Sequence, residues 1–392
     1  MLTAGVGLAV LLPQVWALPF VFLLAMRFLF GGVQAGGFPV IGRIMADWMP
    51  LSERGFAQGC IWTLSRVGGF VIPLVLSFLV LWFSDRPGRM HLAAQAVASQ
   101  GIAPSGMGAP AWPQALAALR VATLDASVRA SWPIPFVLLG GLGVVWCLAF
   151  WPWFRNRPEQ MPQVNPGERA LIEAGRPAMK DQPRAVPWSR MLGSVTFWSL
   201  CLMYGFTGFS GNFFTSGLLP LYLDKHRHME ADARAWLTGL PLAGGAVACL
   251  LGGYASDLLI RRSGNRKWGR RVSGMIGLSL AGLALLSTIW VHNVWLLGLL
   301  LTLSFFGNDL TMGPAWASCA DVGERYTGSV SGAMNMIGAF FGAAGTKLAG
   351  YLMHEGQAEW MFILFAGVYG LAALSWLGVD VTRRLAGPPV AR

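Results

Sequence analysis

Long apolar segments alternate with short charged or proline-bearing stretches along the whole chain. A helix needs about 20 apolar residues to cross about 30 Å of hydrocarbon, and all of the segments but the first reach that length. The segments span residues 2–12, 15–40, 57–83, 134–154, 195–222, 235–260, 272–291, 294–320, 327–352 and 360–380. This pattern predicts an all-α membrane protein with about ten transmembrane segments. The first segment ends before Pro13 and, as a helix, would cover only about half of the bilayer.

The stretch 155–194 is polar and proline-bearing, and it separates four apolar segments from six. We therefore expect an incomplete N-terminal bundle at 1–154 with a long outer loop at 84–133, a linker at 155–194, and a complete six-helix bundle at 195–384. Two helical bundles joined by a cytoplasmic linker are typical of transporters that bind substrate between their halves. The first bundle is two helices short of that plan.

Lysine and arginine residues concentrate between particular apolar segments, with seven of them in 155–190 and six in 261–271. Positively charged loops stay on the cytoplasmic side of a membrane, so we expect both stretches to be cytoplasmic. Alternation of the segments then places both termini in the cytoplasm of a multi-pass protein in the cell inner (plasma) membrane. Because one chain carries both bundles, we expect a monomer whose surroundings are the lipid bilayer.

Composition supports a membrane protein and excludes other classes of function. The chain is 55% hydrophobic and 12% charged, and its mean hydropathy is +0.53. Its net charge of +11 lies in the loops, so it reflects membrane topology rather than binding of nucleic acid. The five cysteines lie in apolar segments without metal-ligand spacing, and His226 with His228 is a weak metal pair. The sequence shows no P-loop, cofactor motif or catalytic cluster, so we expect neither an enzyme nor an ATP-driven pump.

Two stretches of the N-terminal part carry a family likeness. Arg27–Pro39 followed by Asp47–Gly55 resembles the fourth helix and the following loop of the anion:cation symporter group, within the major facilitator superfamily. Trp153–Glu159 is similar to that group's exit from its sixth helix into the central linker. In this alignment residue 1 falls within the third helix of the family, so the chain lacks the counterparts of the first two helices.

The C-terminal part carries the same likeness. Gly252–Arg262 is similar to the superfamily's cytoplasmic signature loop between helices eight and nine, with Leu258 where a basic residue is usual. Asp309–Trp316 and Gly332–Asn335 look like helices ten and eleven of the symporter group. The resemblance implies two helical bundles that work by alternating access. The alternative is a truncated gene model or a short non-transporting membrane protein, because a missing pair of helices would expose polar groups to lipid.

Two arginines lie deep within apolar segments of the N-terminal part, where a charge is costly. Arg27 and Arg66 therefore suggest a pocket for an anion held by planar guanidinium groups, and a carboxylate or a phosphate fits equally. In the alternative, each arginine bonds to carbonyl groups or to a carboxylate on the missing helices. Gln34 follows Arg27 by seven residues, so it lies on nearly the same helix face and should also line the cavity. The resemblance implies a glutamate at this position in many relatives, and a glutamine cannot titrate.

Polar residues also occur inside the apolar segments of the C-terminal part. Tyr204, Asn212 and Asn335 are candidates for contact with a hydroxylated substrate, although polar groups of this kind also join helices to one another. Asp309 beside Asn308 is a candidate for the residue that binds the coupling ion, and a role in helix packing is the alternative.

A charged group lies at the cytoplasmic end of the segment 235–260. Asp257 is followed within five residues by Arg261 and Arg262, which places a carboxylate and two cations on one helix turn and its exit. The resemblance implies that these residues, with Gly253, form a conformational latch that stabilises the outward-facing state and breaks when the bundles rock.

Taken together, the residues and the resemblance predict a secondary active transporter of a small organic anion, such as a sugar acid or another carboxylate. We expect coupling to protons or sodium. Phosphate or a phosphorylated sugar is the alternative substrate.

Overall fold

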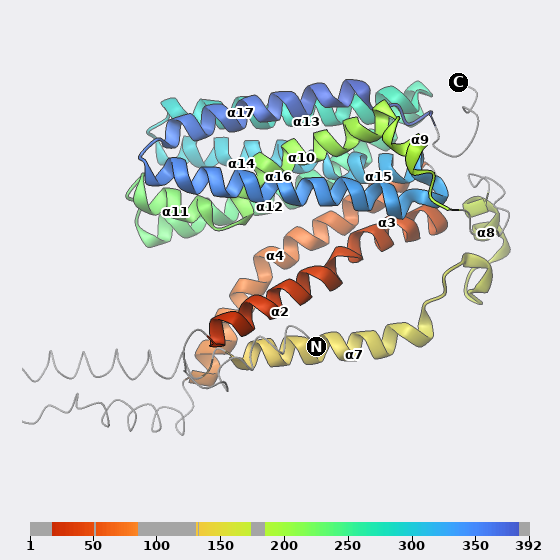
Figure 1. Ribbon diagram of the computed structural model, residues 1–392, viewed down its shortest axis with the longest axis horizontal. Coiled ribbons are helices and arrows are strands. Elements are labelled where there is room, and N and C mark those ends of the chain that lie inside the picture. The colour runs from red at the N-terminus through yellow and green to blue at the C-terminus, as the bar shows by residue number, and fades with distance from the viewer. Residues whose placement is uncertain (1–17, 51, 85–130, 132, 174–184, 384–392) are drawn as a thin grey trace, which may run out of the picture. The chain divides into compact units, whose positions relative to one another are not determined.

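The computed structural model describes residues 18–50, 52–84, 131, 133–173 and 185–383, and all regular structure in these ranges is helical. Figure 1 shows the helices and their labels. The α-helices are α2 (Leu18–Ala35), α3 (Gly37–Trp48), α4 (Arg54–Ser84), α7 (Pro133–Trp153), α8 (Pro166–Glu173), α9 (Trp188–Leu192), α10 (Val195–Thr215), α11 (Leu218–Lys225), α12 (Ala231–Ser263), α13 (Arg266–Ser287), α14 (Val294–Leu310), α15 (Met312–Gly323), α16 (Thr327–His354) and α17 (Ala358–Ser375). Short 3₁₀-helices follow or link several of them: η3 (Pro158–Gln160), η4 (Thr288–Trp290), η5 (Glu324–Tyr326) and η6 (Trp376–Gly378).

The predicted all-α membrane fold is confirmed. Six helical stretches of the described residues are long and apolar enough to cross a membrane: Phe20–Trp48, Pro133–Trp153, Asp232–Ser263, Arg266–Trp290, Val294–Gly323 and Ala358–Gly378. Other predicted segments also form long helices, namely α4, α10 and α16. The segment 2–12 and nearly all of the outer loop 84–133 lie outside the described residues. Within the linker 155–194 the chain forms η3, α8 and α9, which the hydrophobic pattern does not predict.

The chain divides into two compact units, whose boundaries differ from the predicted domains. Unit 1 comprises 1–34 and 71–154. Unit 2 comprises 35–70 and 155–392, so it contains α3, the first half of α4 and all of the C-terminal helices. The reason is packing: α3 lies against α15 and α16, far along the chain. The predicted boundaries at 154, 194 and 384 stay a prediction.

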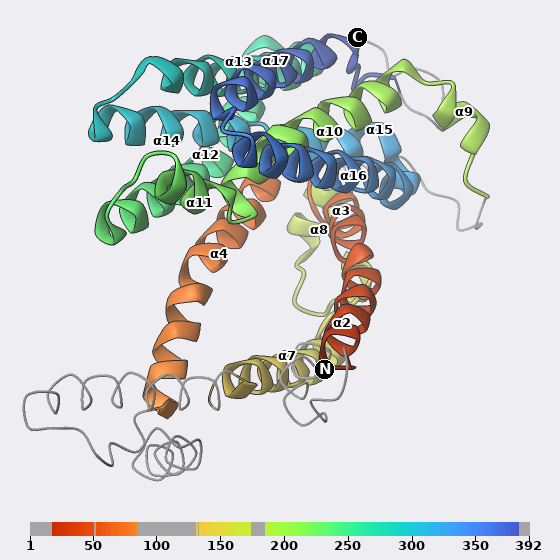
Figure 2. The ribbon, with the colours of Figure 1, turned by 60° about the vertical axis from the view of Figure 1, so that its left-hand side comes forward.

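Within unit 2, six long helices form a bundle. Helix α10 packs against α16 and α17, α12 against α14, and α13 against α14 and α17. These helices lie side by side in both ribbon views (Figures 1 and 2). Rings from two helices pack together in the core, where Phe213 of α10 meets Phe362 and Phe365 of α17 edge to face. All three rings are almost completely buried.

Local sequence fixes several helix ends in this bundle. Asn265 and Asn293 cap α13 and α14, because each side-chain oxygen accepts a hydrogen bond from a backbone N–H of the first turn. Gly264 ends α12 in the left-handed conformation, with φ of 67°. The tight Gly264–Asn265 turn brings the end of α12 next to the start of α13.

The break between α14 and α15 at Thr311 also has a sequence cause. Pro314 has no backbone N–H to donate to the carbonyl of Leu310. At the same place α12 approaches closely, because a side chain on Gly252 would overlap the Leu310 carbonyl. Helices α14 and α15, on either side of this break, both carry residues that line the cavity described below.

Candidate functional site

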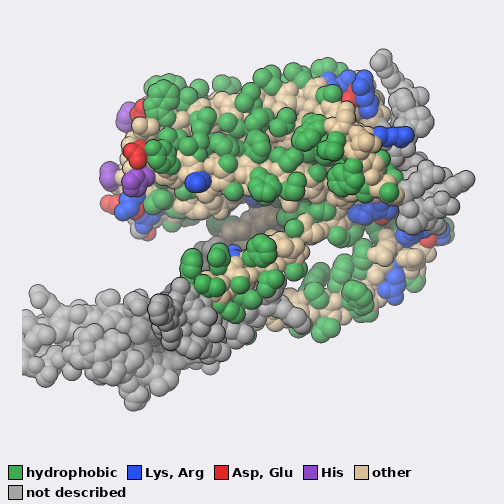
Figure 3. All heavy atoms as spheres, in the orientation of Figure 1, with side chains coloured by type: hydrophobic (Ala, Val, Ile, Leu, Met, Phe, Trp, Pro, Cys, Tyr) green, Lys and Arg blue, Asp and Glu red, His purple; other side chains and the backbone are tan. Residues whose placement is uncertain are grey.

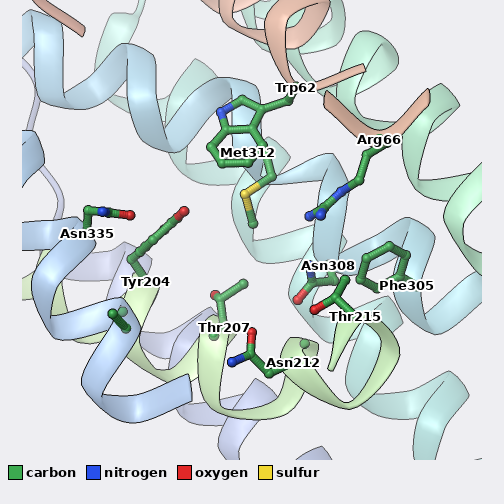
Figure 4. A pocket seen from close by; sticks show the side chains of 14 residues that line it. Trp62, Arg66, Tyr204, Thr207, Asn212, Thr215, Phe305, Asn308, Met312 and Asn335 are labelled. Atoms are coloured by element: carbon green, nitrogen blue, oxygen red, sulfur yellow. The ribbon is translucent and has the colours of Figure 1, made fainter. Parts of the chain in front are cut away.

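A cavity of about 230 Å³ lies in unit 2 between α4, α10, α14, α15 and α16 (Figure 4). It is smaller than the about 300–1,000 Å³ of pockets that hold drug-sized ligands, so it suits a small molecule. Its polar lining residues are Arg66, Tyr204, Thr207, Asn212, Thr215, Asn308 and Asn335. The remaining lining residues are Trp62, Gly208, Gly211, Phe305, Met312, Gly338 and Ala339.

Helix α10 supplies one wall of the cavity through a regular polar stripe. Tyr204, Thr207, Asn212 and Thr215 are spaced so that they share one face of the helix. Two glycines on the same face, Gly208 and Gly211, let neighbouring side chains and backbone approach closely. A polar face on an otherwise apolar helix indicates contact with water or a ligand rather than lipid.

The opposite wall contains a guanidinium group. Arg66 of α4 lies twelve residues after the start of that helix, or about 18 Å along its axis, which is near the middle of a bilayer. Its Nε donates to Oδ2 of Asp309 at 2.5 Å and its Nη2 donates to Oδ1 at 2.7 Å. The third nitrogen, Nη1, makes no hydrogen bond to any residue that the structure describes. The group also lies over the ring of Phe305, 5.0 Å from its centre.

Asp309 is completely buried, and its surroundings hold it in one orientation. Nδ2 of Asn308 donates to Oδ1 of Asp309 at 2.9 Å, and the hydroxyl of Tyr369 donates to Oδ1 of Asn308 at 3.0 Å. The two bonds fix the Asn308 amide so that its donor faces the carboxylate. The result is a chain of hydrogen bonds that runs from α17 through α14 to Arg66 of α4.

Aromatic rings lie next to the cavity. Trp62 stacks on Phe38 with ring centres 5.1 Å apart, and Trp316 lies against both of them at 5.6 and 5.5 Å. Tyr204 meets Trp316 edge to face. On α4, Trp62 lies between Arg54, the first residue of the helix, and the cavity residue Arg66. The rings of Phe38, Trp62 and Trp316 therefore form an aromatic layer between the cavity and the start of α4.

That helix end carries a buried cluster of charges centred on Asp321 of α15. Three guanidinium groups reach this carboxylate, from Arg54 at 3.2 Å, Arg266 at 3.1 Å and Arg270 at 3.4 Å. Arg270, which is completely buried, also binds Asp257 of α12 at 2.7 Å. The cluster joins the start of α4 to α12, α13 and α15.

Close backbone contact accompanies the charges. Oδ2 of Asp257 accepts a hydrogen bond from the N–H of Phe56, in the first turn of α4, at 2.8 Å. Gly253 lies directly against the carbonyl of Gly55, where a Cβ atom would overlap it, and Gly313 of α15 packs on Gly253. Only glycine fits where three helices meet in this way.

A second ion pair lies beyond the end of α17. Asp380 binds Lys267 at 3.2 Å and accepts hydrogen bonds from the backbone N–H and the hydroxyl of Thr382. Partial burial raises the pKa of Asp380, but the bonds from Thr382 and Lys267 lower it, and the net effect is a pKa below the ordinary value.

Figure 3 shows how charges are distributed over unit 2. Lysine and arginine side chains gather at the end where α9 and α15 lie, and the histidines lie at the other end. Arg266 and Lys267, which the sequence assigns to the cytoplasmic side, pair with Asp321 and Asp380. Among the described residues, no group of three His, Cys, Asp or Glu side chains is placed to hold a metal ion.

Four of the six predicted substrate-binding residues come together at the cavity. They are Arg66, Tyr204, Asn212 and Asn335. Arg27 and Gln34 belong to unit 1, and their role in binding stays a prediction. Asp309, the candidate for the coupling residue, is the ion-pair partner of Arg66. It lies on α14, whereas the alternative drawn from the sequence placed a carboxylate partner of this arginine on the missing helices.

The predicted latch differs from the structure in its cations. Asp257 and Gly253 lie at the helix contact as expected, but the partner of Asp257 is Arg270, thirteen residues further along the chain. Arg261 and Arg262 are exposed and make no ion pair with the described residues. The reason is that α12 extends to Ser263, so these two side chains project from its final turn while α13 folds back against it.

Sequence reasoning did not select several residues of the cavity. They are Trp62, Thr207, Thr215, Phe305 and Met312. Helical spacing from Tyr204 and Asn212 would have found the two threonines, since all four lie on one face of α10. The spacing gives no such signal for the three apolar side chains, which look like ordinary core or lipid-facing residues.

These features define a polytopic membrane protein with a polar cavity among its helices. Residues 1–346 match the family model of the Major Facilitator Superfamily, and the chain belongs to this superfamily. The predicted superfamily membership is therefore confirmed.

Curated relatives of this chain are transporters. It is 27% identical over 368 residues to a probable sulfoacetate transporter of Cupriavidus necator, covering 91% of this chain and 72% of the relative. It is 26% identical over 390 residues to the probable galactarate/D-glucarate transporter of Escherichia coli K12, covering 94% of this chain and 74% of the relative. Because the relatives are transporters, the prediction that the chain is not an enzyme is confirmed.

More distant similarities extend to plants and to solved structures. The chain is 20% identical to a sodium-dependent phosphate transport protein of Arabidopsis thaliana chloroplasts, covering 94% of this chain and 62% of the relative. A bacterial homologue of the iron transporter ferroportin, crystallised in an outward-facing state, is 16% identical over 96% of both chains, with a TM-score of 0.48. A likeness of that degree adds nothing to the family assignment.

Proposed function

We propose that this chain is a secondary active transporter that carries a small organic anion across a membrane by alternating access. The observation that carries the proposal is the guanidinium group of Arg66, which lies at mid-membrane depth on a polar cavity with one nitrogen, Nη1, free of hydrogen bonds to the described residues. An arginine in that setting binds a carboxylate, sulfonate or phosphate oxygen more readily than any neutral group.

The remaining lining supports a hydroxylated or otherwise polar anion. The side chains of Asn212 and Asn335 each present an amide to the cavity (Figure 4). Thr207 and Tyr204 present hydroxyl groups to it. The small volume favours molecules of few heavy atoms. Sulfoacetate and galactarate or D-glucarate, which the names of two relatives mention, are small anions of this kind.

In this proposal Arg27 and Gln34 of unit 1 also bind the substrate. The chain lies in the inner (plasma) membrane with both termini in the cytoplasm, acts as a monomer, and takes protons or sodium as coupling ion. The incomplete bundle at 1–154, the linker 155–194 and the bundle at 195–384 are the moving parts.

The cluster around Asp321 supports alternating access. It ties the start of α4 to α12, α13 and α15 by ion pairs, and the aromatic layer of Trp62 and Trp316 lies between it and the cavity. Ion pairs that join the ends of neighbouring helices form in one state of a transporter and break in the other. In this proposal the cluster holds together the cytoplasmic end of unit 2 in one of the two states.

Uptake into vesicles containing the purified chain tests the proposal. The panel contains labelled sulfoacetate, D-glucarate and phosphate, with glucose as a neutral comparison. Removing Arg66 alone would leave a buried carboxylate, so the informative variant is the double change Arg66→Gln with Asp309→Asn, which removes both charges together.

The matched control is Arg190→Gln, which removes an exposed cation without an ion pair to the described residues. We expect uptake of at least one anion by the wild type and by the control, and a loss of uptake of about tenfold or more in the double variant, the size of one lost charge-assisted contact. Uptake of glucose, or anion uptake that the double variant retains in full, would contradict the proposal.

A further inference from the structure

We propose that the turn between α12 and α13 binds the phosphate group of an anionic phospholipid through Arg261 and Arg262. The partner is a lipid of the membrane leaflet at that end of unit 2. This surface is separate from the cavity at Arg66, so the inference holds whatever the cavity binds.

The turn lies at the surface of the membrane. The stretches Asp232–Ser263 and Arg266–Trp290 are both long and apolar enough to span a bilayer. They meet at the Gly264–Asn265 turn, so this turn is at the level where the hydrocarbon ends. Arg261 and Arg262 lie in the last turn of α12 and are therefore next to the lipid headgroups.

Exposed tryptophans mark the same level. Trp268 of α13 is 48% exposed, and Trp290, which is 69% exposed, follows 22 residues later at the other end of the same span. The two positions are about 33 Å apart along the helix axis, close to the thickness of the hydrocarbon core, and partly exposed tryptophans are typical of both interfaces of a bilayer. A Cβ atom on Gly269 would overlap Ile260, so the first turn of α13, with Trp268, lies at the depth of the last turn of α12.

The stretch 258–271 contains six basic residues, and two of them stand apart from the other four. The four with partners are Arg266 and Arg270, which pair with Asp321, Lys267, which pairs with Asp380, and Arg271, which donates to the carbonyl of Val379. Arg261 and Arg262 are exposed and make no ion pair with the residues that the structure describes. Two adjacent exposed cations at headgroup level attract an anionic membrane surface.

A phosphodiester suits two neighbouring guanidinium groups. Each guanidinium is planar and presents N–H groups that can bind two phosphate oxygens at once. At the headgroup level, the aliphatic part of an arginine side chain packs along the apolar interface while its charged end reaches the phosphate. Both arginines can therefore contact one headgroup without leaving the end of α12.

The surroundings favour an anionic headgroup over a zwitterionic one. The stretch 258–271 contains no acidic residue, so the turn itself offers no carboxylate to the ammonium group of a headgroup. The carboxylates that pair with α13, which are Asp257, Asp321 and Asp380, are buried and already bind cations of the protein. A phosphatidylglycerol, which has no cation of its own, therefore gains the full attraction of both arginines.

Lipid binding to the purified chain in a neutral detergent tests the inference. Phosphatidylglycerol and phosphatidylcholine with the same acyl chains are added in separate titrations, and native mass spectrometry counts the lipids bound to each chain. We expect the first phosphatidylglycerol to bind about 25-fold more tightly than the first phosphatidylcholine, because each basic residue near an anionic surface strengthens the attraction about fivefold.

Arg261→Gln combined with Arg262→Gln is the test variant, and it should bind the two lipids with equal affinity. Arg261→Lys combined with Arg262→Lys keeps both charges and should keep most of the preference for phosphatidylglycerol. Lys225→Gln is the matched control, because Lys225 is exposed near the other end of unit 2 with Asp224 beside it. Its loss should leave the preference for phosphatidylglycerol unchanged.

Equal affinity of the wild type for the two lipids would refute the proposal without any variant. A double glutamine variant that keeps the preference would also refute it, because the anionic lipid would then bind elsewhere. Glycerol phosphate, which has no acyl chains, should not displace phosphatidylglycerol at equal concentration. Displacement would show a site for a soluble phosphate and overturn the assignment to lipid.

Discussion

Replacement of Arg270 by leucine should destabilise unit 2 more than almost any other single change in a charged residue. This guanidinium is completely buried and donates to the hydroxyl of Ser256 at 3.0 Å, to Asp257 at 2.7 Å and to Asp321 at 3.4 Å. Asp321 keeps two other cations in the variant. Asp257, which is 1% exposed, keeps only the N–H of Phe56 as a partner among the described residues, so the loss falls mainly on its carboxylate.

The size of the expected loss in stability follows from the partners that Asp257 and Asp321 keep in the variant. Breaking a buried ion pair by removing one partner costs about 3–5 kcal/mol, because the other charge stays buried without compensation. We therefore expect Arg270→Leu to lower the free energy of unfolding by about 3–5 kcal/mol. Adding Asp257→Asn removes the orphaned charge, and an asparagine oxygen can still accept from Phe56, so the double variant should recover about 1–3 kcal/mol.

Denaturation of the purified chain in mild detergent, followed by fluorescence of its 18 tryptophans, measures these differences. Arg262→Leu is the control, since it removes an exposed cation at the same end of the helix pair and should change stability by no more than about 0.5 kcal/mol. Equal losses in Arg270→Leu and Arg262→Leu, or no recovery in the double variant, would refute the reasoning.

Two further predictions concern the same end of unit 2. Gly253→Val places a side chain against the carbonyl of Gly55 and should lower the free energy of unfolding by about 1–3 kcal/mol. Gly350→Ala, whose new methyl group meets open space, should change it little. Similar losses for the two variants in a denaturation series would contradict this prediction. The pKa of Asp380 is below its ordinary value, so its ion pair with Lys267 stabilises the fold above the unfolded-state pKa of about 3.9 and ceases to do so as pH falls through the folded-state pKa. Asp380→Asn should therefore lower stability by about 1 kcal/mol or less at neutral pH and not at all in acid, and an equal loss at both would speak against the pair.

The hydrophobic pattern predicts the helices well, because a membrane-spanning helix needs a long apolar run that few other structures contain. Helix ends are less predictable. Helix α12 begins at Ala231 and α4 at Arg54, in polar stretches outside the apolar segments, because helices continue into the interface where polar side chains are solvated. The division into two units was not predictable, since it depends on which distant helices α3 packs against.

The candidate site shows the same limit in finer detail. Single residues such as Arg66 and Asp309 stand out because charge inside an apolar segment is rare. Their pairing joins positions 243 residues apart, and nothing in local spacing specifies it. Asp257 illustrates the opposite error, because its nearest cations in sequence, Arg261 and Arg262, are not its partners in space.

The hydrogen bond from Phe56 to Asp257 has a consequence for how this end of the protein moves. An acidic side chain that accepts from first-turn amides and faces the positive end of the helix dipole acts as a helix cap, and α4 receives this one from a residue 201 positions away. If α4 separates from α12, its first turn loses that acceptor together with the favourable charge, a change of about 1 kcal/mol. The first turn of α4 should then fray, so that separation of the helices at this end of unit 2 can be measured as faster exchange of the Phe56 amide hydrogen with solvent.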